Sequence, residues 1–574
     1  MKRYQRYNTI YDRYPTTKMP TPFFVFKDAA AILNQLKLLP KKNLAFDVYP
    51  GANVLPLIEL LKDDYTIIRL EEDYVSSSVI DALVAPYLTN DRVFGKMNPI
   101  RLVDYYPHSH IEKTKRRVKA AIKPVVIVGL GASLVDNQAI KVFVDCPRWE
   151  LQLQFRQGGS NFHTHNPNED WLKKYKRGFF LDWVLGDAYK FEHFDQFHYF
   201  IDVGNAQSPT MIDQRSMQLA IARLSHQPFR LVPYFDPGVW GGQWMKEVCQ
   251  LPEGPKNYAW SFDGVPEENA VRVADDHHVF SMPAQNLVYF GKATLLGQHV
   301  YQRFGSYFPI RFDFLDTMQG DHLSLQVHPK TKYIQETFGM PFTQDESYYI
   351  LDCESDGTVY LGLKDGINQE EFWQTLTLAN EGKLTSPAIE KYVNCYPVKR
   401  HDHVSIPAGT IHCSGKNTMV LEISATPYIF TFKLWDWSRL GLDGKPRPVH
   451  LEHGKANLDW TITTQFVETE LMKKPEMIRD REEKTGLHHT QFIETRRLTF
   501  DANEPILVNT HESVNMANLV EGDEIEIHPI DASIPPLVIH YAETFIVPAS
   551  VKRYYLKKRT PGKAMVIQAF VRSL

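Results

Sequence analysis

The stretch LSLQVHP, residues 323–329, decides how the second half of the chain is interpreted. On a β-strand, residues i and i+2 point to the same face, so Gln326 and His328 share one face while apolar residues occupy the other. A carboxylate, Glu346, follows in QDESYYILD just before another apolar run, and His412 ends the segment IPAGTIH. Four polar side chains in otherwise apolar strands predict that these side chains meet inside a β-structure.

The donor atoms of these four side chains suit a metal ion. Glutamine, histidine and glutamate supply N and O ligands, which favour a borderline divalent metal such as zinc, with iron, cobalt or manganese as alternatives. Four ligands from different strands leave room for a water or substrate position, as in catalytic sites. Taken singly, the Gln-x-His motif also fits an ordinary surface strand, and the turn before His412 also fits an ordinary turn.

The chain around this constellation is typical of all-β structure. From about residue 228 onward, short runs of Val, Ile, Phe, Tyr and Thr are separated by Gly, Pro, Asp and Asn. This pattern predicts a β-sandwich or barrel. Residues 368–392 interrupt it with helical spacing and good helix formers, which predicts a mostly helical insertion. A second β-rich stretch, residues 491–574, ends the chain.

The first 225 residues have a different pattern, in which strands and helices alternate. Residues 124–129 (PVVIVG) and 139–144 (AIKVFV) are apolar, β-branched runs. Such alternation predicts βαβ units around a mostly parallel sheet. The glycine turn after residue 128 resembles a phosphate-binding loop, but the motif GxxxxGK[ST] is absent. The alternatives are a degenerate P-loop, kinase-like domain and an accessory or oligomerisation domain.

Composition bounds the class of protein. The 574 residues include 64 Lys and Arg against 68 Asp and Glu, a formal net charge of −4, which does not favour nucleic-acid binding. The five cysteines form no CxxC pair, so a reducing compartment fits better than a disulfide scaffold. We find neither a signal peptide nor an apolar stretch long enough for a membrane. We therefore expect a cytoplasmic protein without membrane partners, and the sequence leaves its oligomeric state open.

The order of several motifs resembles the type I phosphomannose isomerases, and the resemblance covers about residues 228–574. These are zinc-dependent, cupin-fold enzymes that interconvert mannose 6-phosphate and fructose 6-phosphate. Each motif is weak alone, but their order together is specific. The matching motifs are VWGG (239–242), WSFDG (260–264), FPIRFDFLD (308–316), LSLQVHP (323–329), YLGLK (360–364), IPAGTIH (406–412) and WDWSRLGLDGKPRPVHLEH (435–453).

The resemblance implies roles for individual residues. The four metal ligands would be Gln326, His328, Glu346 and His412, holding one divalent metal, zinc by preference. Lys433 stands where short bacterial members have an arginine, which is a departure because lysine is a point charge whose pKa can move. Lys433 would stabilise the charge of a cis-enediol(ate), and Glu422 would handle a proton. The expected donors to the substrate phosphate are Lys330, Arg439 and Lys445.

The expected architecture is an α/β N-terminal domain followed by all-β cupin (jelly-roll) domains with a helical insertion. The domains would span residues 1–225, 228–455 with the metal, and 456–574. In the last, VPAS at 547–550 echoes IPAG, but Lys552 or Val551 stands where the ligand His412 would be. We therefore expect a second cupin without metal. The expected activity is mannose-6-phosphate isomerase; the alternative is a catalytically weak regulatory protein that binds sugar phosphates.

Overall fold

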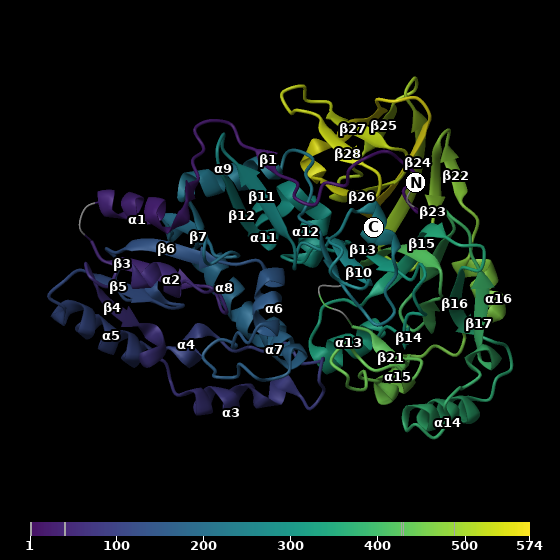
Figure 1. Ribbon diagram of the computed structural model, residues 1–574, viewed down its shortest axis with the longest axis horizontal. Coiled ribbons are helices and arrows are strands. Elements are labelled where there is room, and N and C mark those ends of the chain that lie inside the picture. The colour runs from purple at the N-terminus through teal and green to yellow at the C-terminus, as the bar shows by residue number, and fades with distance from the viewer. Residues whose placement is uncertain (1–2, 40–41, 426–427, 429, 487, 574) are drawn as a thin grey trace.

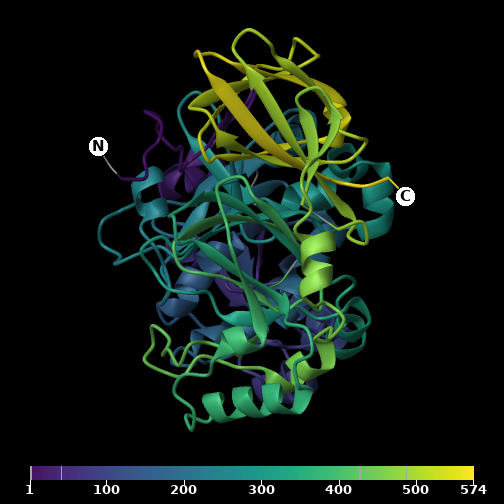
Figure 2. The same ribbon diagram turned by 90° about the vertical axis from the view of Figure 1, so that its right-hand side faces the viewer.

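The computed structural model describes residues 3–39, 42–425, 428, 430–486 and 488–573. Its strands form one seven-stranded sheet near the N-terminus, two β-sandwiches of two sheets each, and one small three-stranded sheet. Figure 1 shows the N-terminal sheet on one side of the molecule and the central sandwich on the other. Figure 2 shows the C-terminal sandwich stacked at one end of the central one.

The N-terminal sheet has a parallel core, in which β4, β5, β3, β6 and β7 run in the same direction. Fully apolar runs suit such a core because both faces of a parallel sheet are covered. In sheet order, the strands are β2 (Phe26–Lys27), β8 (Thr210–Asp213), β7 (Tyr199–Asp202), β6 (Ile140–Asp145), β3 (Leu44–Val48), β5 (Val125–Val128) and β4 (Thr66–Arg69). The accompanying helices are α1 (Asp28–Leu38), α2 (Leu55–Glu59), α3 (Ser77–Leu88), α4 (Leu102–Tyr105), α5 (His108–Ala120), α6 (Arg148–Arg156), α7 (Trp171–Arg177), α8 (Trp183–His193) and α9 (Gln214–Leu224).

The glycine turn after β5 holds one of the chain's own carboxylates. The backbone N–H of Gly131 donates to Asp47 Oδ1 at 2.9 Å, and Ser133 donates to the same carboxylate through its N–H and its hydroxyl. A phosphate-binding loop needs such amides for its ligand. The amides of this turn are thus bonded to Asp47, and the P-loop interpretation stays a prediction.

The central sandwich is built from two antiparallel sheets whose inner faces pack together. One sheet has the order β18 (His403–Ile406), β15 (Asp345–Cys353), β20 (Thr418–Ala425), β13 (Arg311–Asp316), β10 (Trp260–Gly264) and β9 (Tyr234–Asp236). The other has the order β17 (Val393–Pro397), β16 (Thr358–Leu363), β19 (His412–Ser414), β14 (Leu325–Val327) and β21 (Phe432–Trp435). Strands β13 and β20 are buried along their whole length and form the middle of the core.

Helices in this half of the chain partly match the sequence interpretation. The expected insertion at 368–392 contains α14 (Gln369–Asn380) and a short 3₁₀ turn, η5 (Ile389–Lys391). Residues 285–304, which we expected to be β-structure, are helical, because their apolar side chains pack beside α9 and the C-terminal sandwich. The helices of this region are α10 (Trp244–Val248), α11 (Gln285–Leu296), α12 (Gln298–Phe304), α13 (Thr331–Phe338), α15 (Leu451–Asn457) and α16 (Thr464–Phe466).

The C-terminal sandwich has its own apolar core. Lys552, at the position that matches His412, is exposed beside the short turn η7 (Ala549–Val551). One sheet has the order β22 (Glu476–Arg479), β23 (Glu482–Thr485), β24 (Ile493–Asp501), β31 (Lys563–Val571), β26 (Asn515–Glu521) and β29 (Thr544–Val547). The other has the order β25 (Ile506–Asn509), β30 (Arg553–Lys558), β27 (Glu524–Pro529) and β28 (Leu537–His540).

The first residues of the chain lie apart from the N-terminal sheet. Strand β1 (Thr17–Lys18) pairs with β11 (Ala270–Ala274), which pairs with β12 (Val279–Pro283). Arg6 pairs with Asp352, and Tyr11 donates to Asp263, both in the central sandwich. The chain's basic and aromatic start therefore contacts buried carboxylates of the central sandwich, and the expected domain of residues 1–225 stays a prediction.

Candidate active site

The two sheets of the central sandwich bring the four predicted metal ligands together. Gln326 on β14 lies directly opposite His412 on β19, and His328 follows the end of β14. Glu346 comes from β15 in the facing sheet. Its Oε2 lies 3.1 Å from His328 Nε2, and its Oε1 lies 2.7 Å from His412 Nε2. All four side chains are buried, so the group lies inside the sandwich.

The histidine rings are oriented as metal ligands usually are. His328 Nδ1 lies 2.8 Å from the carbonyl of Phe430, and His412 Nδ1 lies 2.9 Å from the carbonyl of Thr410. Carbonyls only accept hydrogen bonds, so each Nδ1 carries a proton, and in the neutral ring, which is the form that binds a metal, each Nε2 then presents a lone pair to Glu346. Lone pairs facing a buried carboxylate repel it unless a cation lies between them. The residues present therefore fit a divalent metal.

The other two donor groups are consistent with this fit. Gln326 Nε2 lies 3.2 Å from His412 Nε2, and a flip of the amide would turn its oxygen to the same point. Burial raises the pKa of Glu346, but positive charge on the nearby rings of His328 and His412 outweighs burial and holds that pKa well below its usual range. Where the rings are neutral, a bound cation would supply this positive charge. The carboxylate is thus charged, as a metal ligand must be.

A glutamine connects this group to a second carboxylate. Gln344 Nε2 donates to Glu346 Oε2 at 3.1 Å and to Glu422 Oε1 at 3.2 Å. Glu422 on β20 lies opposite Asp313 on β13. Burial, then the charges of Glu346 and Asp313, raises the pKa of Glu422 well above its usual range. This shift favours the protonated form of Glu422, which is the form that a proton donor needs.

Lys433 lies beside the same ligands, on β21 directly opposite Gln326. Burial and then the positive charge of Arg447 lower its pKa to about 7. Among the residues that the structure describes, no carboxylate forms an ion pair with its ammonium. A lysine with this pKa can both accept and donate a proton near neutral pH.

A cavity of about 480 Å³ opens above these residues. Gln326, Gln344, Glu422 and Lys433 line its inner end, and the loop at 441–448 lines its mouth. Figure 1 places α6 and α7 on the side of the N-terminal sheet that faces the central sandwich. The N-terminal residues that line the cavity are Arg92, Val93, Gln152, Arg156, Trp171, Leu172 and Tyr175.

The three cations predicted for the substrate phosphate do not line this cavity. Lys330 Nζ instead pairs with Asp459 Oδ2 at 3.1 Å. Arg439 bonds to the carbonyl of His322 and to Asp436, and Lys445 is exposed. Their role in binding the substrate phosphate therefore stays a prediction, which these positions do not support.

A cation that the sequence interpretation missed lies in the cavity instead. Arg447 Nη1 lies 3.2 Å from Ser324 Oγ and 2.9 Å from Asp436 Oδ1. Ser324 is two residues before Gln326, on the same face of the chain. Arg447 belongs to the segment GKPRPVH that carried part of the resemblance, so the only available signal was its place in that motif.

Sequence comparisons give a family profile and several relatives. A family profile described as a domain of unknown function (DUF8485) matches residues 28–226. Mannose-6-phosphate isomerase ManA of Bacillus subtilis is 26% identical over 235 residues, which is 40% of this chain and 67% of the relative. Mannose-6-phosphate isomerase of Streptococcus mutans is 25% identical over 228 residues, or 39% of this chain and 66% of the relative. The match thus spans about two thirds of the length of these relatives.

Solved structures that are named as mannose 6-phosphate or phosphomannose isomerases also resemble this chain. The mannose 6-phosphate isomerase from Bacillus subtilis gives a TM-score of 0.46 at 19% identity, covering 60% of this chain and 99% of that chain. A mutant of the phosphomannose isomerase from Salmonella typhimurium gives a TM-score of 0.48 at 14% identity, covering 61% of this chain and 100% of that chain.

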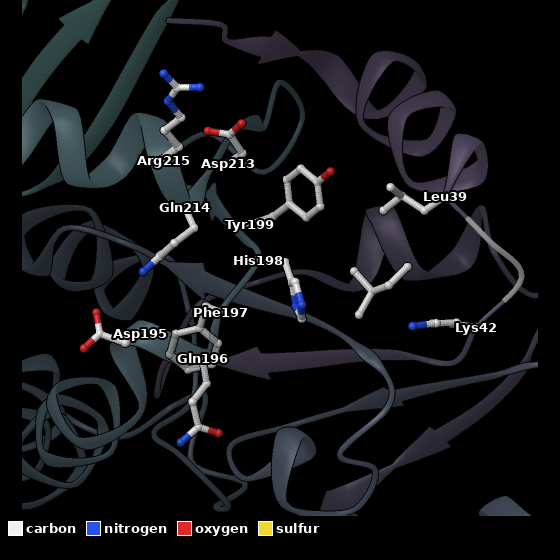
Figure 3. Close-up of a pocket in the computed structure, with 11 residues that line it drawn as sticks. Leu39, Lys42, Asp195, Gln196, Phe197, His198, Tyr199, Asp213, Gln214 and Arg215 are labelled. Carbon is white, nitrogen blue, oxygen red and sulfur yellow. The ribbon is translucent and has the colours of Figure 1, made fainter.

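Other polar groups lie away from the cavity. A hollow of about 510 Å³ beside β6, β7 and β8, drawn in Figure 3, is lined by Lys42, His198 and Arg215 among others. His198 Nδ1 accepts from the backbone N–H of Lys141 at 3.0 Å. A second His/Glu group, formed by Glu470, His488 and His489, lies at the surface ahead of β24, within the part expected to lack metal. No helix of the described chain is long and apolar enough to cross a membrane.

Proposed function

We propose that the protein is a metal-dependent aldose–ketose isomerase that interconverts mannose 6-phosphate and fructose 6-phosphate. The observation that carries the proposal is the buried constellation of Gln326, His328, Glu346 and His412 at the inner end of a cavity that also contains Lys433. The sequence relatives are named as mannose-6-phosphate isomerases, which supports the same reaction.

The metal would be held by these four side chains, and zinc is the preferred ion because the donors are imidazole, carboxylate and amide. A bound divalent metal supplies Lewis acidity, which makes the hydrogen on the carbon next to a carbonyl more acidic. The Nδ1–H groups of His328 and His412 keep the rings in the orientation that such binding requires.

Lys433 and Glu422 would move the protons of the reaction. Isomerisation transfers a proton between C2 and C1 of the open-chain sugar through a cis-enediol. With a pKa of about 7, Lys433 is available both as an amine that accepts a proton and as an ammonium that stabilises a negative oxygen. Glu422, whose pKa is raised by burial and by neighbouring carboxylates, would return a proton, and Gln344 bridges it to Glu346.

The phosphate of the substrate would lie at Arg447 and Ser324. Two guanidinium groups, those of Arg439 and Arg447, share the carboxylate of Asp436, which leaves positive charge at the mouth of the cavity. Guanidinium groups bind phosphate through paired, charge-assisted hydrogen bonds. Ser324 adds a hydroxyl donor at one strand step from the ligand Gln326.

The test is conversion of mannose 6-phosphate to fructose 6-phosphate by the purified protein. We expect activity that is lost with a chelator and restored by zinc. The matched control is His528→Ala, which removes a histidine outside the cavity, and it should retain activity and metal. A metal-loaded protein that binds mannose 6-phosphate without converting it would instead support a sugar-phosphate-binding regulatory protein, which the lysine at position 433 in place of arginine favours as the second candidate.

A further inference from the structure

One wall of the cavity comes from the part of the chain that matches a domain of unknown function. Residues 28–226 precede all the motifs that resemble the isomerases, yet several of their side chains line the cavity. One of these side chains is Trp171, which begins α7, is partly exposed and lines the cavity. The guanidinium of Arg156 lies 4.4 Å from the centroid of its ring.

Arg156 fixes Trp171 against the central sandwich. Its two terminal nitrogens donate to both oxygens of Asp236 on β9, at 2.8 and 2.7 Å. Such a bidentate pair has a defined geometry and is difficult to rotate. Asp236 lines the cavity itself, so the ring of Trp171 is held at a set position in the cavity wall.

Arg92 fixes the mouth of the cavity in a similar way. Its Nε lies 2.5 Å from Asp170 Oδ2, and its Nη2 lies 2.6 Å from Asp443 Oδ2. Asp170 is the N-cap of α7 and accepts from the N–H of Leu172 at 3.0 Å. Asp443 lies four residues before Arg447 in the same loop. One guanidinium therefore connects the start of α7 to the loop that would bind phosphate.

Deeper in the cavity, the polar groups of this wall are already bonded. Gln152 and Tyr175 each donate to Glu268 at 2.8 Å. The wall thus presents aromatic and aliphatic surface to the cavity, while the opposite side presents Gln326, Lys433 and other polar groups. A sugar has both kinds of surface, since its C–H groups pack on aromatic rings and its hydroxyls form hydrogen bonds.

We propose that residues 28–226 form the substrate-selecting wall of the isomerase cavity, in which Trp171 contacts the carbon chain of the phosphosugar and Arg92 positions the phosphate-binding loop through Asp443. This inference rests on the proposed function. It gives the N-terminal segment a role in binding and leaves the proton transfers to the central sandwich. Trp171 is a contact residue, and Arg92 is a positioning residue.

The test compares KM and kcat for mannose 6-phosphate in full-length, metal-loaded variants. For Trp171→Ala we expect KM to rise about tenfold, the loss typical of removing a buried aromatic anchor, with kcat within about threefold of wild type. The KM of Trp171→Phe should lie between the KM values of the wild type and Trp171→Ala. The matched control, Trp373→Ala, removes a half-buried tryptophan of α14 outside the cavity and should leave KM unchanged. Metal content is measured for each variant.

The connection between Arg92 and Asp443 is tested with Arg92→Gln, Asp443→Asn and the double variant. Each single change should raise KM about tenfold, and the double variant should be no worse than either, because both break one connection. Additive effects would overturn the positioning role of Arg92.

If the wild-type protein converts mannose 6-phosphate and KM is unchanged in Trp171→Ala and Trp171→Phe, the proposal of a substrate-selecting wall is overturned and the isomerase proposal is not. A wild-type protein that neither converts nor binds mannose 6-phosphate would overturn both proposals, whereas binding without conversion that is weakened in the variants would overturn isomerisation and support the wall.

Discussion

Replacing Lys433 with methionine should make the protein more stable and nearly inactive. Methionine has a similar length and volume but no charge, so the substitution removes an ammonium group from a largely apolar strand while preserving packing. At the same time it removes the group that we propose accepts and donates a proton. Gain of stability together with loss of turnover is the expected signature of a functional residue in an unfavourable environment.

The magnitude follows from the pKa of Lys433, which is about 7 against 10.5 for an ordinary lysine. At about 1.4 kcal/mol per pKa unit, keeping the charged form in this site costs at most about 5 kcal/mol. The side chain is partly open to the cavity, where water screens the charge. We therefore expect a free-energy cost of about half that upper limit. Lys433→Met should therefore raise the free energy of unfolding by about 2–3 kcal/mol at pH 6.

The sign of the pH dependence is fixed by the lowered pKa. Below pH 7 the lysine is charged in the folded and unfolded states, so its full cost is present. Between pH 7 and 10.5 only the unfolded chain is charged, so the cost shrinks as the pH rises, and the advantage of Lys433→Met should fall to about 1 kcal/mol at pH 9.

The assay is urea unfolding of both proteins at pH 6 and pH 9, in the same metal state, alongside turnover. Lys332→Met, which changes a lysine whose side chain is 85% exposed, is the control and should show neither effect. Equal stabilities of wild type and Lys433→Met at both pH values would refute the buried-charge reasoning. Turnover within a few-fold of wild type would remove Lys433 from the mechanism.

Three further outcomes are expected. His412→Ala should lose metal, measured by elemental analysis, and activity, whereas His528→Ala should keep both; retained metal in the first would exclude the proposed ligand set. Glu422→Gln should lower kcat by about 100-fold at unchanged metal content, the usual effect of losing a general acid–base group, and an unchanged pH–rate profile would contradict its role. Arg447→Ala should raise KM for mannose 6-phosphate by about 10–100-fold, as expected for a charge-assisted phosphate contact, while Lys330→Ala should not; the reverse order would restore Lys330 as the phosphate donor.

Local sequence patterns predicted many elements of this fold. The β-branched run at 124–129 contains β5, the run at 139–144 overlaps β6, and Gln326 of the alternating segment LSLQVHP lies on β14. These predictions succeeded because strand periodicity is a property of neighbouring residues. The helices at 285–304 were missed, because their side chains are buried against elements far away in the sequence, and such packing overrides local patterns.

The sequence by itself determined the residues that can bind a metal, since donor chemistry and the i, i+2 spacing on a strand are local. Only the tertiary structure decided their relation to Glu346 in the facing sheet, the raised pKa of Glu422 and the lowered pKa of Lys433, because burial and charge depend on contacts between distant segments. It also decided that Arg447 lines the cavity in place of Lys330, and that Trp171 of the N-terminal segment forms part of its wall. Distances between strands, loops and helices that are hundreds of residues apart follow from packing, which no short stretch of sequence records.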